Sequence, residues 1–294
     1  MTTIAFIGLG IMGSPMAVHL QKAGFDVIGI NRTPEKTAAL VEAGGRAAGS
    51  IAEAVPDADI VALMVPDSPD VVQVLREDGV LDHARPGTLV IDFSSIRPDI
   101  AAELAAEAEE KGLRMLDAPV SGGEPGAINA TLSIMVGGAA ADFEAAADVF
   151  AAVGKTIVHV GPSGAGQTVK AANQLIVAVN MEALAEAIVF LEAYGVDLPA
   201  AVEVLGGGLA GSAVLNQKAG KMLDRNFDPG FRIDLHHKDL GIVTAAAREA
   251  GVAVPAGALA AQLMGSARAN GDGGLDHSGL YRGVARLSGI HHER

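Results

Sequence analysis

The stretch Thr3-Ile-Ala-Phe-Ile-Gly-Leu-Gly-Ile-Met-Gly13 joins a short apolar run to the spacing G-x-G-x-x-G. An amphipathic helical pattern follows at once, over residues 13–23. A strand, a tight glycine turn and a helix in this order are typical of a dinucleotide-binding unit. An ordinary glycine turn is the alternative interpretation, but the spacing of the glycines and both flanks favour the nucleotide site.

Each glycine of this motif has an expected task. Gly8 permits the tight turn, Gly10 lets the backbone approach a pyrophosphate, and Gly13 allows the helix to pack closely. The N–H groups at the start of the helix would face the anion. We therefore expect the pyrophosphate over the segment Gly10, Ile11 and Met12.

The rest of the first half alternates apolar runs with helical stretches. The expected strands are Thr3–Ile7, Asp26–Ile30, Ile60–Val65, Thr88–Asp92 and Arg114–Pro119, and two more runs, Leu132–Val136 and Thr156–Val160, extend the sheet. The expected helices are Gly13–Ala23, Pro34–Ala43, Ser68–Leu75, Pro98–Lys111 and Ala139–Phe150. This alternation predicts a Rossmann-type α/β domain, a parallel sheet covered by helices on both faces.

The pattern changes at the turn-rich segment Gly161-Pro-Ser-Gly164. One long helix is expected from about 165 to 194, with a central run, Leu175–Met181, that is apolar nearly all round and so should be buried. Only helical patterns follow: Pro199–Leu205, Val214–Leu223, His236–Ala250 and Pro255–Asn270. We predict two domains, 1–163 and 164–294, the second all-helical and joined through the long helix. The tail Gly289–Arg294 suggests no role.

Composition excludes several classes of protein. Half of the residues are hydrophobic and 19% are charged, as in globular proteins, and the absence of cysteine excludes disulfides and thiolate metal sites. The formal net charge of −14 argues against nucleic-acid binding. We expect no membrane span, because no apolar run reaches the roughly 18–20 residues that one needs. Because a strand pattern begins at the first residues, without a signal-peptide pattern, we expect a cytoplasmic protein.

The segment Asn31-Arg32-Thr33 follows the second strand, where a site selective for NAD usually carries Asp or Glu. A neutral Asn avoids repelling a 2′-phosphate, Arg32 can pair with that phosphate through its planar guanidinium, and Thr33 adds a hydroxyl. The alternative is that Arg32 is a solvated turn residue. The pattern favours NADPH as cofactor, with NADH possible.

Later strand ends should line the same crevice. The first carries Val65 and Pro66; the next carries Ser95, which could bind the ribose or the substrate, although Asp67 and Ser95 could equally cap helices. Farther along, Ser121, Gly122 and Gly123 form a loop whose N–H groups and hydroxyl suit a carboxylate. A tight turn is the alternative for that loop.

Lys170 is the only Lys, Arg, Asp or Glu between Lys155 and Glu182. A lone charge on an apolar helix is unusual for a purely structural residue. If Lys170 faces a cleft, burial would make its amine a usable acid. Asn173 and Gln174 stand three and four residues later, so they can share its face of the helix. A snorkelling surface Lys is the alternative.

Residues 231–240 form the most basic short stretch of the chain. Lys238 could reach the active site and Asp239 could anchor a neighbour, or the stretch could be a solvated helix start. His236 and His237 are adjacent, so they face different sides of a helix. No spacing of His or carboxylate residues supports a metal site.

With these segments together, the whole chain resembles the β-hydroxyacid dehydrogenase family, which includes 3-hydroxyisobutyrate dehydrogenase. Four ordered motifs carry the resemblance: Phe6–Gly13, Asp117–Gly123, Gly164–Asn173 and Lys238–Leu240. The segments Gly122–Ile128, Gly207–Ser212 and Arg225–His236 are most similar to the members that reduce tartronate semialdehyde. Many relatives have two Asn residues where this chain has Asn173 and Gln174, which leaves the role of position 174 open.

The resemblance implies Lys170 as the catalytic residue. It implies that Ser121, Gly122, Gly123 and Asn173 contact the region of the substrate carboxylate and that Lys238 lies near cofactor and substrate. Val65, Pro66 and Ser95 match further cofactor positions of the family. A Rossmann domain, a long interdomain helix and a helical domain that forms a homodimer or homotetramer are also implied.

We hypothesise that NADPH transfers hydride to the aldehyde carbon of a small carboxylate, most specifically tartronate semialdehyde to give D-glycerate, while Lys170 protonates the alkoxide. The alternatives are 3-hydroxyisobutyrate, methylmalonate semialdehyde or succinic semialdehyde as substrate, an imine reductase, and a catalytically silent dinucleotide-binding scaffold. The presence of Lys170 argues against the last two.

Overall fold

The computed structural model describes residues 1–290, so the last four residues of the tail lie outside it. The chain divides into two compact units, Met1–Lys170 and Ala171–Arg294. The sequence places the boundary at 163/164, at the glycine turn, whereas this division falls six residues inside the long helix that follows the turn.

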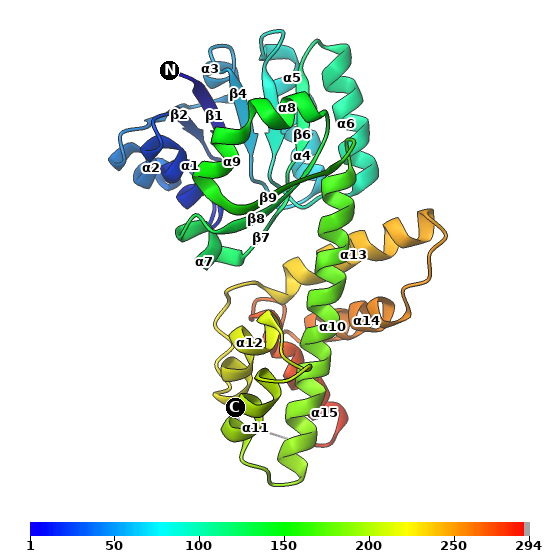
Figure 1. Cartoon of the computed structure of the whole chain (residues 1–294). Coiled ribbons are helices and arrows are strands. Elements are labelled where there is room, and N and C mark those ends of the chain that lie inside the picture. Colours follow the sequence, from blue (N-terminus) through cyan, green and yellow to red (C-terminus); the bar gives the residue numbers. More distant parts are fainter. Residues whose placement is uncertain (291–294) are drawn as a thin grey trace. The chain divides into compact units, whose positions relative to one another are not determined.

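Unit 1 contains one nine-stranded sheet (Figure 1). Its strands are β1 Thr3–Ile7, β2 Asp26–Ile30, β3 Arg46–Ala47, β4 Ile60–Leu63, β5 Leu89–Asp92, β6 Arg114–Asp117, β7 Val120–Ser121, β8 Leu132–Gly137 and β9 Gly154–Gly161. The order is β3-β2-β1-β4-β5-β6-β8-β7, with β9 beside β8. The strands from β3 to β6 are parallel, in the doubly wound order of a Rossmann domain.

The sheet departs from the expected parallel arrangement at β8, which pairs antiparallel with β6 and β7. The chain between β7 and β8 contains only the six-residue helix α7, Gly123–Ile128, so it turns back rather than crossing over. Parallel pairs need a longer crossover, such as the two helices that separate β8 from β9.

Helices cover both faces of the sheet because alternate strand residues point to opposite sides. Ile4 and Phe6 face a core shared with α1 Gly13–Lys22, α2 Ala38–Glu42, α7 and α9 Ala147–Val153. Ala5 and Ile7 face a second core, shared with α3 Ile51–Ala54, α4 Ser68–Val72, the π turn Gln73–Glu77, α5 Val80–His83 and α6 Pro98–Glu110. The 3-10 turn Pro34–Thr37 and α8 Ala140–Ala145 complete unit 1. The predicted α/β class is confirmed.

Unit 2 is helical. The long helix α10, Ala165–Ala193, begins in unit 1 and is followed by α11 Leu198–Gly206, α12 Ala213–Leu223, α13 Ile233–Glu249, α14 Pro255–Ala269, the 3-10 turn His277–Gly279 and α15 Leu280–Leu287. Asp197 and Ser212 cap α11 and α12 by accepting N–H bonds of the first turn. The described residues of unit 2 form no strand, only an isolated bridge between Arg232 and Asp276.

Helix α10 overturns one expectation. It is long and apolar enough to cross a membrane, with mean hydropathy 1.7 in its most apolar 18-residue window. The judgement that no run reaches this length was wrong. Length and composition are weak support for a span, since core helices share them, and Ala178, Met181 and Leu184 belong to the core of unit 2.

Candidate cofactor and substrate site

The glycine-rich loop lies between β1 and α1, at the carboxyl edge of the sheet. Gly8 has φ +97°, and a Cβ there would lie 2.3 Å from the carbonyl oxygen of Met64. A Cβ on Gly13 would lie 1.9 Å from the oxygen of Gly8, so any side chain would push α1 off the loop. A Cβ on Gly10 would meet nothing within 4 Å. The open side of Gly10 is where a ligand can approach the backbone.

Asn31 braces this loop from the end of β2. Its Oδ1 accepts the Leu9 N–H at 2.9 Å, and its Nδ2 donates to the Thr33 carbonyl at 2.9 Å. The next residue, Arg32, has a side chain that is 78% exposed and pairs with Asp70 of α4 at 3.2 Å. Arg32 is thus a solvated residue held at the rim of the strand ends, available to a phosphate that can compete with Asp70.

The ends of β4 and β5 are joined by buried polar contacts. The Val65 N–H donates to Ser94 Oγ at 3.0 Å, and the Ser94 N–H donates to Asp92 Oδ1 at 2.9 Å. Asp67 caps α4, so the capping interpretation holds for that residue. Pro66 is exposed and Ser95 is half-buried; their contact with a cofactor stays a prediction.

The Ser121 loop follows β6. Ser121 ends β7, and Gly122 and Gly123 have φ +138° and +62°, values that a side chain would strain. Lys170 reaches this loop from α10, where its Nζ donates to the carbonyl of Val120 at 2.8 Å. Lys170 is only 8% exposed, so the snorkelling alternative does not hold. The structure places the lone amine beside the proposed carboxylate loop.

Asp117 fixes the start of the helix that carries Lys170. It is 3% exposed, its Oδ1 accepts the Gly164 N–H at 2.7 Å and its Oδ2 accepts the Gln167 N–H at 2.9 Å. Burial raises the pKa of the Asp117 carboxyl, although the hydrogen bonds from these N–H groups oppose the shift. The carboxylate caps α10 less than two turns before the amine.

Gln167 ties the same helix turn to the neighbouring strand end. Its Oε1 accepts the Ile96 N–H at 3.0 Å and its Nε2 donates to the Ser94 carbonyl at 2.8 Å. Sequence reasoning gave no role to Asp117, Gln167 or Ser94. An Asp within an apolar strand pattern was the available signal for Asp117. The partners of Gln167 and Ser94 are too distant in sequence to leave a local pattern.

In unit 2, Asn173 and Lys238 belong to one hydrogen-bonded group. Asn173 Nδ2 donates to Gln174 Oε1 at 2.7 Å, and Gln174 Nε2 donates to Asp239 Oδ2. Asp239 Oδ1 pairs with Lys238 Nζ at 2.8 Å. Asp239 therefore anchors neighbours as the sequence suggested. The solvated-start alternative fits Arg232 and Asp234, which are exposed, but not the half-buried Lys238.

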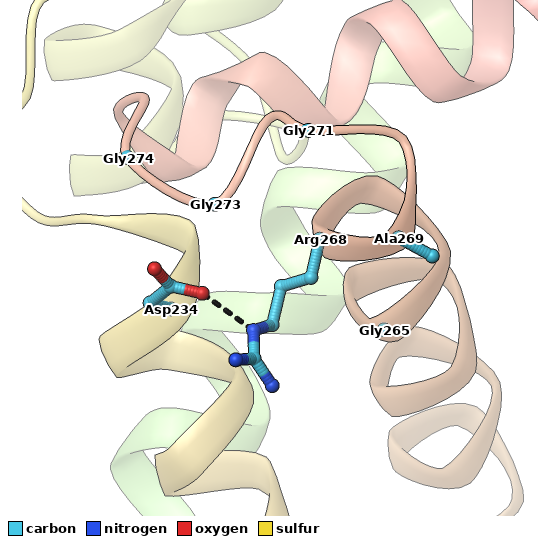
Figure 2. A pocket seen from close by; sticks show the side chains of 7 residues that line it. All are labelled: Asp234, Gly265, Arg268, Ala269, Gly271, Gly273 and Gly274. Carbon is cyan, nitrogen blue, oxygen red and sulfur yellow. Dashed lines mark hydrogen bonds and ion pairs between the residues drawn. The ribbon is translucent and has the colours of Figure 1, made fainter.

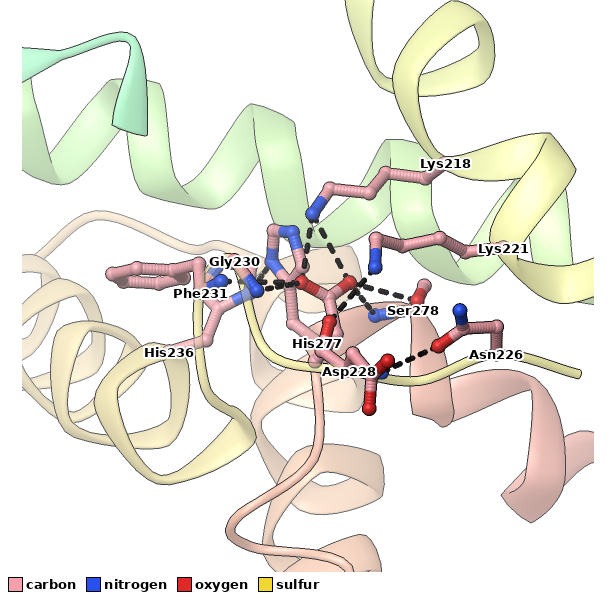
Figure 3. Close-up of polar contacts among 10 residues, drawn as sticks. Lys218, Lys221, Asn226, Asp228, Gly230, Phe231, His236, His277 and Ser278 are labelled. Carbon is pink, nitrogen blue, oxygen red and sulfur yellow. Dashed lines mark hydrogen bonds and ion pairs between the residues drawn. The ribbon is translucent and has the colours of Figure 1, made fainter. Parts of the chain in front are cut away.

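Two buried histidines, His236 and His277, contact each other, and His236 also contacts this group; Figure 3 shows the two rings. His236 Nε2 lies 3.3 Å from the Gln174 carbonyl, and its Nδ1 lies 3.0 Å from His277 Nδ1. A carbonyl only accepts, so in the neutral pair His236 carries its proton on Nε2 and His277 donates from Nδ1. Burial lowers the pKa of His277 well below its usual value, assisted by the charges of His236 and Lys218.

Asp276 supports the same region as a fully buried hub. It accepts hydrogen bonds from Lys218, Ser278 and the backbone N–H groups of Gly230 and Phe231. These contacts hold the chain before α13 against the 3-10 turn at 277–279 (Figure 3). The cluster is structural, and it steadies the helix start that presents His236 and Lys238.

A shallow surface pocket of about 520 Å³ lies elsewhere in unit 2 (Figure 2). It is lined by Asp234, Gly265, Arg268, Ala269, Gly271, Gly273 and Gly274. Arg268 pairs with Asp234, and none of the predicted site residues lines the pocket. Among residues 1–290, no three His, Asp or Glu side chains are grouped to hold a metal ion.

The residues at the sheet edge fit a nicotinamide dinucleotide. Gly10 leaves its backbone open, the N-terminus of α1 has no side-chain cap, and Arg32 offers an exposed guanidinium. An uncapped helix N-terminus beside an open glycine suits a pyrophosphate.

Family models match both units. Residues 3–161 match the NAD binding domain of 6-phosphogluconate dehydrogenase, and residues 164–284 match the NAD-binding domain of NADP-dependent 3-hydroxyisobutyrate dehydrogenase. The fold, the strand-end site and these matches define an oxidoreductase that binds NAD(P).

Relatives extend over nearly the whole chain. A 2-hydroxy-3-oxopropionate reductase of Escherichia coli is 42% identical over 97% of this chain and 98% of its own. An NAD-dependent L-serine dehydrogenase of Pseudomonas aeruginosa is 42% identical over 90% and 91%. A solved 3-hydroxyisobutyrate dehydrogenase of Mycobacterium tuberculosis, with L-serine, is 37% identical, covers 96% of this chain and 98% of its own, and has a TM-score of 0.88. The chain belongs to the β-hydroxyacid dehydrogenase family that includes 3-hydroxyisobutyrate dehydrogenase.

Proposed function

We propose that this enzyme reduces tartronate semialdehyde to D-glycerate with NADPH. The observation that carries the proposal is the buried Lys170 amine, held on the Val120 carbonyl immediately before the Ser121 loop. The 42% identity to the reductase from Escherichia coli supports the choice of substrate. Asn31 and Arg32 support the choice of NADPH, because neither repels a 2′-phosphate.

The residues that would hold the cofactor are those at the strand ends: Gly8, Gly10, Ile11, Met12, Gly13, Asn31, Arg32, Thr33, Val65, Pro66 and Ser95. Bound NADPH supplies the hydride that the aldehyde carbon receives. The Ser121 hydroxyl and the N–H groups of Gly122 and Gly123 bind the substrate carboxylate. Lys170, as an ammonium, donates a proton from Nζ to the carbonyl oxygen as it gains negative charge. Asn173 and Lys238 are proposed as further contacts on the basis of the family resemblance.

A second candidate is the oxidation of L-serine or 3-hydroxyisobutyrate. The relative from Pseudomonas aeruginosa acts on L-serine, and the solved relative from Mycobacterium tuberculosis carries it. The same residues would serve this direction, with neutral Lys170 accepting the hydroxyl proton. L-Serine, glycerate and 3-hydroxyisobutyrate are all 3-hydroxypropionates and differ in the group at the carbon next to the carboxylate, which is amino, hydroxyl or methyl. A loop that binds the carboxylate therefore suits all of them.

A panel of substrates tests these proposals. Tartronate, methylmalonate and succinic semialdehydes are assayed with NADPH and NADH, and L-serine, D-glycerate and 3-hydroxyisobutyrate with the oxidised cofactors. We expect kcat/KM for tartronate semialdehyde with NADPH to exceed that of every other pairing in the panel by about 10-fold. This is the ratio that about 1.4 kcal/mol of differential binding gives. A higher value for L-serine with NAD⁺ would favour the second candidate, and no turnover at all would favour the silent scaffold.

Assembly and location remain separate predictions. A homodimer or homotetramer is expected from the family resemblance, and light scattering after size-exclusion chromatography measures the mass directly. The cytoplasmic location is checked by fractionation of cells that express the tagged chain.

A further inference from the structure

Gln174 uses both ends of its side-chain amide. It is 5% exposed, its Oε1 accepts from Asn173 and its Nε2 donates to Asp239. A carboxylate only accepts, so the NH₂ of Gln174 must face Asp239 and the oxygen must face Asn173. Rotating the amide by half a turn would set oxygen against carboxylate and nitrogen against nitrogen. The orientation of Gln174 therefore fixes that of the Asn173 amide.

Asp239 passes this constraint on to Lys238. The carboxylate is 4% exposed, and its two oxygens bind different partners, Gln174 through Oδ2 and Lys238 through Oδ1. A carboxylate buried to this extent needs both charge compensation and hydrogen bonds. If the amide donor were lost, the carboxylate would be free to turn, and the Lys238 ammonium would lose its fixed place.

Helix α13, which carries Asp239, also holds the backbone of Gln174. His236 Nε2 donates to the Gln174 carbonyl, and His236 and Asp239 stand three apart on α13, so they share one face. His277 in turn binds His236 through Nδ1. One face of α13 thus holds residue 174 by its carbonyl and by its side chain.

We propose that Gln174 is a positioning residue for the substrate. It sets the amide of Asn173 directly and the ammonium of Lys238 through Asp239, and these are the two groups of unit 2 expected to contact the substrate or cofactor. The inference rests on the proposed function for the identity of the ligand, but the hydrogen-bonded group that carries it lies wholly within unit 2. It gives a role to the position at which this chain differs from many relatives.

The first test is Gln174→Met, which keeps the volume and removes both hydrogen bonds. Groups that bind substrate equally in ground and transition states affect KM rather than kcat. We expect KM for the preferred carboxylate substrate to rise about 10-fold, while kcat stays within about 3-fold. The control is Gln217→Met, which makes the same change on the exposed face of α12. It should leave both KM and kcat unchanged.

The second test, Gln174→Glu, separates positioning from mere packing. The introduced carboxyl has the same size, and when protonated it can donate to Asp239, whereas when ionised it faces Asp239 as a like charge. The kcat/KM of the variant relative to wild type should fall about 10-fold between pH 5 and pH 8. Adding Asp239→Asn supplies an amide donor to that carboxylate and should abolish the slope. The titratable groups of α13 that face this position are His236, Lys238 and Asp239.

Crystal structures of the cofactor-free variants give a readout besides activity. The proposal expects the Asp239–Lys238 ion pair to be broken and the Asn173 amide to turn in Gln174→Met, with thermal stability sufficient for crystallisation in at least one of the variants. It is overturned if the pair and the amide stay in place, or if KM is unchanged and Gln174→Glu shows no pH slope. If the panel finds no substrate, the proposed function fails, and the crystal structures alone decide whether Gln174 positions its neighbours.

Discussion

Unit 1 and unit 2 hold their predicted site residues by different means. At the sheet edge of unit 1, backbone geometry shapes the predicted binding loops: Gly10 leaves its backbone open, Gly122 and Gly123 have positive φ, and the Val120 carbonyl accepts from Lys170. In unit 2 the predicted site residue Lys238 is instead held by side chains, because Gln174 donates to Asp239 and Asp239 pairs with Lys238. In unit 1 the fold of the backbone positions the predicted site residues. In unit 2 their positions depend on each member of the hydrogen-bonded group being present.

The two units also differ in how they treat a buried carboxylate. Asp117 of unit 1 is satisfied by the N–H groups that start α10. Glu182 of unit 2 is 8% exposed, and its Oε2 has no hydrogen-bond partner. Burial raises the pKa of Glu182 to about 7, and the nearby Glu186 adds to the shift. The first carboxylate caps α10, and we expect the second to destabilise unit 2 when it is ionised.

The largest expected effect comes from Lys170→Ala. General acid catalysis contributes about 10²–10⁴-fold, so kcat should fall by about that factor. Fluorescence titration should show NADPH binding close to that of wild type, because the amine faces the Ser121 loop and not the glycine-rich loop. A kcat within about 3-fold of wild type would remove Lys170 from the chemistry.

Asp117→Ala tests how strongly the buried carboxylate of unit 1 stabilises the start of α10. It leaves two buried N–H groups of α10 without an acceptor and should lower the free energy of unfolding by about 2–3 kcal/mol in urea titrations. Asp67→Ala, which removes the cap of α4 in the same unit, should cost only about 1 kcal/mol. Equal losses for both variants would mean that Asp117 is an ordinary cap.

Glu182→Gln tests the strained carboxylate of unit 2. Because the folded pKa is raised from 4.5 to about 7, the native state favours the protonated form, and stability from this group is lost as pH rises through that window. The variant should be more stable than wild type by about 1–2 kcal/mol at pH 8 and equally stable at pH 4.5. Urea unfolding at both pH values measures this difference. A gain in stability that is the same at both pH values would contradict the raised pKa of Glu182.

The smallest effect is expected at the rim of unit 1. Asp70 pairs with Arg32 and would repel a 2′-phosphate, so Asp70→Asn should lower KM for NADPH about 2–5-fold and leave KM for NADH unchanged. Arg32→Gln should act in the opposite direction, raising KM for NADPH about 10-fold. Equal shifts for the two cofactors in either variant would disconnect this pair from cofactor choice.

The sequence predicted those features that depend on local pattern. The bounds of β1 and β2 agree with the apolar runs, and α10 begins at Ala165 as expected after the glycine turn. Short elements such as β3 and α3 were missed, because two to four residues carry too little periodicity. Lys170 could be predicted because it is a lone charge on an apolar helix. The contacts that hold the predicted site residues could not be predicted, because Asp117 lies 47 residues from Gly164 and Gln174 lies 65 residues from Asp239.

The cap formed by Asp117 also makes one segment intolerant of changes in length. An α-helix turns by about 100° per residue, and α10 is anchored to the sheet edge at Gly164 and Gln167. Inserting or deleting one residue between Gln167 and Lys170 would rotate the amine about a quarter of the helix circumference away from the Val120 carbonyl. The number of residues between the Asp117 cap and Lys170 is therefore fixed by geometry, because only this spacing brings the amine to the Val120 carbonyl.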